Sequence, residues 1–152
     1  MDWVAVGFAG FIAITLATAL FWAFRSLGWT IFSPTTFLGC LWGGDPSRPA
    51  TDTIGLVSLY VVGAVAVPAI YSMAFEALSG PSWQLGAAFG ALHGILFAAA
   101  LPLFGTITAC VRGGAIPQPR WFGIGWGWFT PLSLIVGHVL YGGMVGAILA
   151  SF

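Results

Sequence analysis

Hydrophobic residues in this chain gather into four long runs that contain no charged side chain. The runs cover residues 3–24, 53–75, 83–104 and 131–152. Each has about 22 residues, which as a helix extends about 33 Å and matches the hydrocarbon core of a bilayer. The pattern predicts an all-α fold, a polytopic transmembrane four-helix bundle that forms a single domain over residues 1–152.

Composition narrows the class of protein further. Apolar residues make up 59% of the chain and charged residues 5%, and the mean hydropathy is +1.01. A water-soluble domain needs more polar groups than this to cover its surface. The formal net charge is zero and lysine is absent, so no basic surface for nucleic acid is expected. We therefore expect a multi-pass protein of the cell inner (cytoplasmic) membrane whose partners are membrane lipids and other membrane protein subunits.

The first hydrophobic run is expected to remain in the protein as a span. A cleavable signal peptide begins with basic residues, whereas Asp2 is the only charge before this run. The run is also longer than the apolar region of a typical signal peptide.

The arginines predict an orientation in the membrane. All four lie in the loops 25–52 and 105–130, at Arg25, Arg48, Arg112 and Arg120. The positive-inside rule then predicts that both loops are cytoplasmic and both termini external. Within the first loop, the apolar stretch 26–44 is interrupted by Ser33-Pro34-Thr35-Thr36. It is expected to be interfacial or re-entrant rather than a fifth span.

The two halves of the chain resemble each other. Trp3 and Gly10 have the same spacing as Trp83 and Gly90, and a Cys-x-x-Gly-Gly motif begins at both Cys40 and Cys110. These similarities predict two similar helical hairpins related by an axis along the membrane normal. Chance similarity among helices rich in Gly, Ala and Phe is the alternative. The two cysteines allow one disulfide or two free thiols, and their spacing is not that of a metal site.

Two histidines are the ionisable residues in the middle of the spans, His93 and His138. A polar group at that depth is costly, which makes both candidates for function. Three interpretations remain open. The rings hydrogen-bond neighbouring helices, they are axial ligands of a haem or (bacterio)chlorophyll, or they belong to a proton or substrate path. The last has little support, since no Asp or Glu lies in mid-span.

Glycines repeat every fourth residue beside both histidines. The third run contains Gly86, Gly90 and Gly94, and the fourth continues the spacing of its histidine with Gly142 and Gly146. Such stripes of small residues predict close helix packing between the third and fourth spans. Pro68 is expected to kink the second span, because proline removes a helical hydrogen bond.

The most distinctive loop alternates aromatic residues with glycine. It contains Arg120, Trp121, Trp126 and Trp128. Tryptophans in this pattern are typical of an aromatic belt at the depth of the lipid headgroups. Arg120 is expected to bind a lipid phosphate there, and a docking surface for a protein partner is the alternative.

The second half of the chain also resembles a known family. The segment Ala91-Leu92-His93-Gly94, the loop motif Pro117-x-Pro119-x-Trp121-Phe122-Gly123-x-Gly125 and the run from Thr130 through Gly137-His138-x-x-Tyr141-Gly142 are similar to a family of small four-span bacterial and archaeal membrane proteins. The resemblance implies the four-span architecture and a recurring pattern of His93, His138 and Tyr141. It implies no activity.

The expected function is non-catalytic. The sequence contains no nucleophile–base pair, carboxylate dyad, phosphate loop or zinc signature. We expect an accessory subunit of a larger respiratory or photosynthetic membrane complex, the machinery of electron transport. One alternative is a small oligomeric transporter or channel. The other is a haem- or (bacterio)chlorophyll-binding protein that uses His93 and His138 as cofactor ligands.

Overall fold

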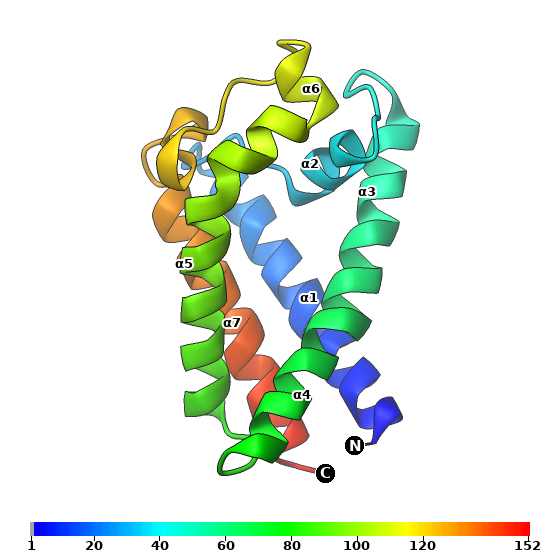
Figure 1. Cartoon of the computed structure of the whole chain (residues 1–152), viewed down its shortest axis with the longest axis vertical. Coiled ribbons are helices and arrows are strands. Elements are labelled where there is room, and N and C mark those ends of the chain that lie inside the picture. Colours follow the sequence, from blue (N-terminus) through cyan, green and yellow to red (C-terminus); the bar gives the residue numbers. More distant parts are fainter. Residues whose placement is uncertain (1) are drawn as a thin grey trace.

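The computed structural model describes residues 2–152, and these residues form helices and no strand (Figure 1). The helices are α1 (Trp3–Ser26), α2 (Pro34–Leu41), α3 (Pro49–Val61), α4 (Val67–Ala77), α5 (Trp83–Ile107), α6 (Ala109–Arg112) and α7 (Thr130–Leu149). A π-helical turn, η1 (Val62–Ala66), joins α3 to α4, and η2 (Trp121–Trp126) is a 3₁₀ turn.

Four helices are long and apolar enough to cross a membrane. They are α1, the continuous helix Pro49–Ala77, α5 and α7. The all-α prediction with four spans is therefore confirmed. Both termini lie at one end of the bundle, and α2, α6 and η2 form a cap at the other end (Figure 1). The stretch 26–44 contributes only α2, whose eight residues are too few to cross a bilayer.

Polar side chains cap three of the helices where the chain enters them. The Asp2 carboxylate accepts hydrogen bonds from the backbone N–H groups of Val4 and Ala5, at 2.9 and 3.2 Å. The Ser82 hydroxyl accepts one from Leu85 at the start of α5. Ser33 does the same for α2. These bonds satisfy N–H groups that a helix end leaves without partners.

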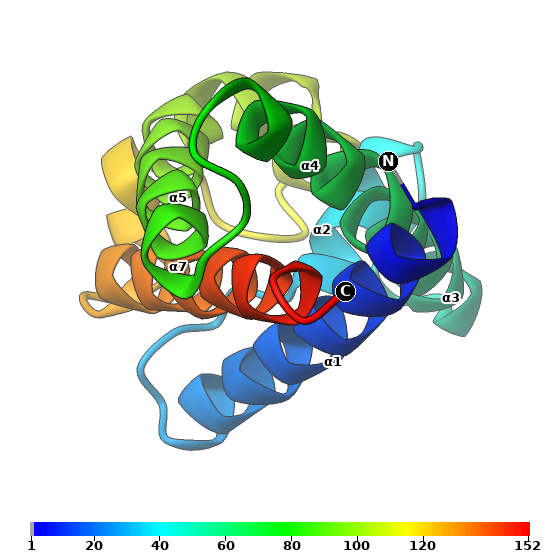
Figure 2. The ribbon, with the colours of Figure 1, turned by 90° about the horizontal axis from the view of Figure 1, so that it is seen from below.

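The four spans are not packed evenly. α7 lies between α1 and α5 and contacts both along its length, and α1 also contacts η1 and α4. The second span contacts α5 mainly through α4, near the turn that joins them. Seen from the end that carries the termini, α1, α7 and α5 follow one another, while α4 stands apart from α5 (Figure 2).

The two hairpins pack in different registers. In the first hairpin, Gly63 faces Ile14 in the middle of α1. In the second, Gly143, which follows Trp83 at the same spacing as Gly63 follows Trp3, faces Trp83 at the first residue of α5. The second span contains a π-helical turn, which α7 lacks. An extra residue in one turn shifts the register of every residue that follows it.

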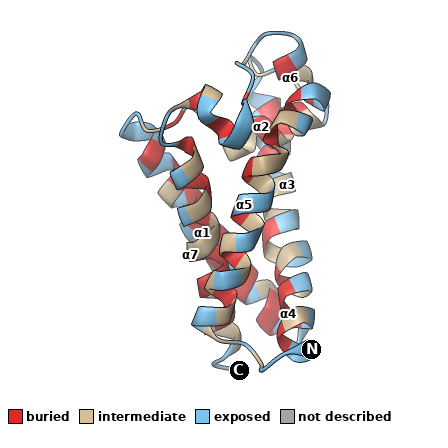
Figure 3. Cartoon of the chain, turned by 60° about the vertical axis from the view of Figure 1, so that its left-hand side comes forward, coloured by how far each residue is buried: buried red, intermediate tan, exposed pale blue. Residues whose placement is uncertain are grey.

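Burial follows this uneven packing. In the most apolar window of each span, 44% of the residues are buried in α1 and in α7, but only 17% in the second span and 22% in α5. Buried residues line the inner sides of the helices, and exposed residues cover the outer sides (Figure 3). Most residues of the second and third spans are thus at least partly exposed to the surroundings.

Candidate functional site

The glycine stripes bring α5 and α7 into backbone contact. A methyl group on Gly90 would overlap the carbonyl oxygen of His138, and one on Gly86 would overlap that of Gly142. Gly146 lies in the same way against the carbonyl of Ser82, and Gly94 against the side chain of His138. The glycines singled out in the sequence therefore lie at this contact, which we call the glycine seam.

The seam places the two histidines side by side. The imidazole rings of His93 and His138 lie edge to face, with their centroids 4.7 Å apart. Nδ1 of His138 lies 2.8 Å from the carbonyl oxygen of Leu134, one turn earlier in α7. Nδ1 of His93 lies 3.2 Å from the hydroxyl of Tyr71 in α4. Both rings therefore have hydrogen-bond partners inside the bundle, as a polar side chain at this depth requires.

A second polar contact crosses the bundle at the π-helical turn. The N–H of Val67 bonds to the carbonyl of Val62, five residues earlier. In that pattern the carbonyl of Gly63 would accept from residue 68, which is a proline and has no N–H. The Tyr141 hydroxyl donates to this carbonyl at 2.7 Å. Tyr141 in α7 thus satisfies an acceptor that the second span cannot satisfy itself.

The expected effect of Pro68 is visible at the same place. The second span changes direction between α3 and α4 (Figure 1). Pro68 itself is fully buried, and it packs close to Gly10 of α1. The bend brings α4 toward α5 and α7 and keeps α3 away from α5.

Between the diverging spans lies a cavity of about 230 Å³, which we call the central cavity. All four spans and the α2 region contribute to its wall. Most of the wall is apolar and aromatic, and its polar side chains are Thr18, His93, His138 and Tyr141. The cavity is partly open, and it lies where α3 and η1 stay apart from α5.

The two histidines do not fit the expectation of a haem held between them. Two axial imidazoles stand on opposite faces of the macrocycle, with the iron between their nitrogens. Here the two rings are in direct contact, at 4.7 Å between centroids, which leaves no space for a macrocycle. A tetrapyrrole on one histidine alone needs more room than 230 Å³, since even pockets for drug-sized ligands measure about 300–1,000 Å³.

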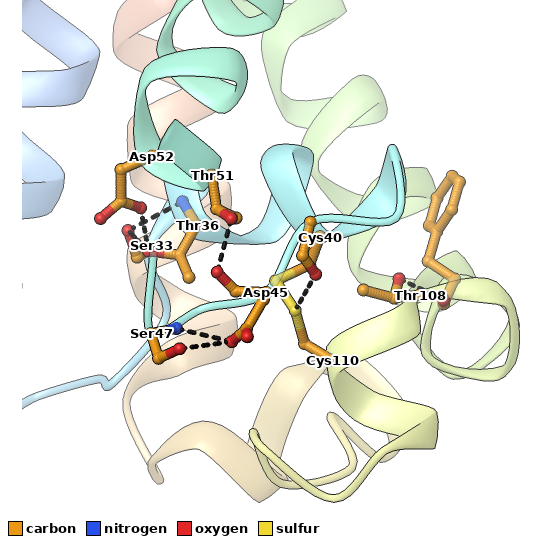
Figure 4. Close-up of a disulfide and its surroundings, with 11 residues drawn as sticks. Ser33, Thr36, Cys40, Asp45, Ser47, Thr51, Asp52, Thr108 and Cys110 are labelled. Atoms are coloured by element: carbon orange, nitrogen blue, oxygen red, sulfur yellow. Dashed lines mark hydrogen bonds between the residues drawn. A yellow bond between two sulfur atoms is a disulfide. The ribbon is translucent and has the colours of Figure 1, made fainter. Parts of the chain in front are cut away.

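The cap holds the two halves of the chain together with a disulfide between Cys40 at the end of α2 and Cys110 in α6 (Figure 4). Of the two states that the sequence left open, the structure has the disulfide. α2 is also tied to α3, because the Thr36 hydroxyl donates to the carboxylate of Asp52 at 2.6 Å. Gly39 and Gly55 lie against the backbones of Thr51 and Thr35, so α2 and α3 touch closely.

The turn before α3 is ordered by Asp45. Its carboxylate accepts hydrogen bonds from the backbone N–H and the hydroxyl of Ser47, at 2.9 and 2.8 Å (Figure 4). These two bonds stabilise the ionised carboxylate and lower the pKa of Asp45 below its usual value of 3.8. Desolvation acts weakly against them.

The aromatic loop is only partly a surface. Trp121 and Trp128 are 67% and 81% exposed, and Arg120 beside them is exposed, as a belt at the headgroups requires. Trp126 was expected there too, and that expectation is wrong, because Trp126 is 3% exposed. Its indole N–H donates to the carbonyl of Pro117 at 2.7 Å, and its ring stacks on Phe32. Trp126 is a core residue of the cap.

The described part of the chain offers no cluster of metal ligands. Residues 2–152 contain no group of three or more His, Cys, Asp or Glu side chains that could hold a metal ion.

Comparison of the chain with protein-family models, with curated proteins and with solved structures found no match.

Sequence reasoning missed two parts of the site. Tyr71 was not singled out, although a tyrosine three residues after Pro68 in a charge-free span was a signal for a polar partner inside the bundle. The central cavity was missed as well, since it depends on which helices stay apart. The histidines were found because no Asp, Glu, Lys or Arg shares the mid-span segments with them.

Proposed function

We propose that this protein is a non-catalytic accessory subunit of a larger respiratory or photosynthetic membrane complex. The observation that supports this function best is the uneven burial of the four spans. The second and third spans bury 17% and 22% of their most apolar windows within the chain, against 44% for the other two. On that side the bundle has two helices in which most residues remain at least partly exposed.

The outer faces of these two spans are regular. Val57, Val61 and Val65 repeat every fourth residue, and each is more than half exposed. Leu92 and Leu96 on α5 have the same spacing and exposures of 57% and 59%. Side chains four residues apart form a ridge along a helix, and ridges of this kind pack into the grooves of a neighbouring helix. We infer that helices of a partner subunit lie against these two ridges.

A transporter or channel is less well supported by the central cavity. A path for polar substrates or ions needs polar and charged groups along it. No Asp, Glu, Lys or Arg lines the central cavity, and its wall is mainly aliphatic and aromatic.

Photo-crosslinking tests the accessory role. A benzophenone amino acid at Val61 or Leu96 should crosslink to one and the same membrane protein, and the tagged chain should migrate on native gels with a haem- or chlorophyll-containing complex. The matched control is Leu16, which is 42% exposed on α1, a span that carries neither ridge. Crosslinks from Val61 and Leu96 to lipid alone, with migration as a free subunit, would contradict the proposal.

Two features of the loops predict opposite orientations of the protein in the membrane. The four arginines predict cytoplasmic loops. The disulfide between the same two loops is typical of an oxidising compartment and rare in the cytosol. We propose that the cap faces the oxidising side of the membrane. The excess of arginine in the loops only favours one direction of insertion, whereas formation of the disulfide requires an oxidant.

Cysteine labelling distinguishes the two orientations. In a chain with Cys40→Ser and Cys110→Ser, a single Ser47→Cys in the cap loop or Ser79→Cys in the opposite turn supplies one exposed thiol. An impermeant maleimide applied to intact cells should label Ser47→Cys and spare Ser79→Cys. The reverse result would establish the orientation that the arginines predict.

A further inference from the structure

We infer that the central cavity binds the head group of a lipid-soluble quinol, an aromatic ring that carries hydroxyl groups. The inference goes beyond the accessory role and does not rest on it, because the cavity lies within the single chain. It depends on the size of the cavity, on the free ring nitrogens of the two histidines and on the aromatic wall.

The size of the cavity selects one ring. An apolar cavity of about 150 Å³ is known to hold a benzene molecule, and pockets for drug-sized ligands begin at about 300 Å³. At about 230 Å³, the central cavity lies between these two values. It accommodates one substituted aromatic ring, while a long tail attached to that ring has to leave through the opening.

His138 supplies a hydrogen-bond acceptor. Its Nδ1 lies against the carbonyl of Leu134, which can only accept, so Nδ1 carries the hydrogen and Nε2 of the neutral ring is an acceptor. No partner for Nε2 occurs in residues 2–152, and no fully buried side-chain nitrogen or oxygen there lacks a partner. Nε2 is therefore accessible, and His138 lines the central cavity.

His93 supplies a donor beside that acceptor. The Tyr71 hydroxyl has Nδ1 of His93 as its hydrogen-bond partner, and a phenol donates more readily than it accepts. With Nδ1 as the acceptor, the hydrogen of the neutral ring is on Nε2. The two rings are in contact and both residues line the cavity, so the wall offers one donor and one acceptor on adjacent rings. A hydroxyl group satisfies both, since it donates to His138 and accepts from His93.

The remaining wall suits a flat ring at membrane depth. Phe32, Phe37 and Phe97 line the cavity, and the ring of Phe97 lies 5.5 Å from that of His138. Aromatic rings bind one another in stacked and edge-to-face geometries at such distances. The cavity is partly open and lies where the second span and α5 stay apart, so we infer that a ligand enters between these spans from the bilayer. These features together favour a quinol with an isoprenoid or alkyl tail.

The test is a binding titration with the whole chain in nanodiscs, corrected for empty nanodiscs. The probe is a benzoquinol with a ten-carbon tail, kept reduced, and the matched probe is its dimethyl ether, which keeps the ring and the tail and carries a methyl group in place of each hydroxyl hydrogen. We expect saturable binding of the quinol, at least about tenfold tighter than that of the ether, as the loss of a hydrogen bond to a buried partner implies.

Variants locate the site. Leu59→Trp places a large ring at the cavity wall from α3, where Leu59 is half-buried, and should abolish quinol binding. Leu56→Trp on the same helix is the control, because Leu56 is exposed and does not line the cavity. His138→Phe should weaken quinol binding about tenfold and leave ether binding unchanged. The thermal unfolding of each variant shows that it is folded.

Three results would overturn the inference. They are the absence of saturable quinol binding, equal affinities for quinol and ether, and quinol binding that survives Leu59→Trp in a folded protein. If His138→Phe does not fold, the comparison of the two probes on the unmodified chain and on Leu59→Trp still decides the question.

Discussion

The two sides of α5 show opposite ways of arranging helices in a membrane. Toward α7, the glycine seam brings two backbones together, with Gly86, Gly90 and Gly142 against carbonyl groups of the opposite helix. Toward the second span, α5 has large side chains and few contacts, and the central cavity lies there. One side of α5 is thus packed closely against α7, while the side that faces the second span makes few contacts.

The difference lies in the type of contact. The glycine seam is closed by van der Waals packing along many residues, which small side chains permit. The open side is held at separate points by side chains that reach across it, such as Tyr141 to Gly63 and Tyr71 to His93. Distributed packing resists any local opening, whereas point contacts can be removed one at a time.

Gly90→Leu should break the glycine seam. A branched side chain at Gly90 would overlap the carbonyl oxygen of His138, so α5 and α7 must separate. We expect a loss of more than about 3 kcal/mol in the free energy of unfolding, beyond the usual cost of overpacking. Gly7→Leu is the matched control, because a side chain there meets no atom within 4 Å. If both variants unfold alike in a detergent titration, the seam does not hold the bundle.

Removal of the disulfide should loosen the open side at the cap. Cys40 and Cys110 are 70 residues apart, and the bond joins the cap segment packed on α3 to the segment that follows α5. We expect Cys40→Ser with Cys110→Ser to lose about 2 kcal/mol, at the lower end of the typical range, since separated helices stay constrained in a bilayer. Reduction of the unmodified protein should give the same loss. An unchanged unfolding midpoint in both samples would show that the cap does not hold the open side.

Tyr141→Phe should remove one point contact across the open side. It leaves the carbonyl of Gly63 without a donor, and we expect a loss of about 1 kcal/mol. The loss should shrink when Pro68→Ala is also present, because residue 68 then has an N–H to offer that carbonyl. A double-mutant cycle measures this coupling. Tyr60→Phe, which removes a bond to Thr15 on the surface, is the control. Additive effects of Tyr141→Phe and Pro68→Ala would contradict the assignment.

Acidification should have the smallest effect on stability, and it should act at the turn before α3. The folded protein holds the pKa of Asp45 below its usual value of 3.8. The stability that comes from its bonds to Ser47 is therefore present above pH 4 and is lost as the pH falls through the lowered pKa. We expect a slight fall in melting temperature below pH 4 that Asp45→Asn abolishes. A fall of equal size in that variant would assign the effect to another carboxylate.

The spans could be predicted from the sequence because their signal is local. A run of about 20 apolar residues is enough to identify each one, and glycines at every fourth position identify the face that packs. The cavity could not be predicted, since it depends on the register between η1 and α7, which Tyr141 and Gly63 set from 78 residues apart. Trp126 was mistaken for a surface residue because its burial depends on Phe32, far earlier in the chain, and on how the aromatic loop folds back onto Pro117.

The disulfide also makes a closed ring of the chain. Residues 40–110, with the second and third spans inside them, form a covalent loop. A protease that cuts the exposed turn around Ser79 therefore opens this ring without releasing a fragment. The cut protein would run as one band on a denaturing gel until a reductant separates it into two. The second and third spans, which contact each other mainly near one turn, are thus the two that a single cut in that turn cannot part.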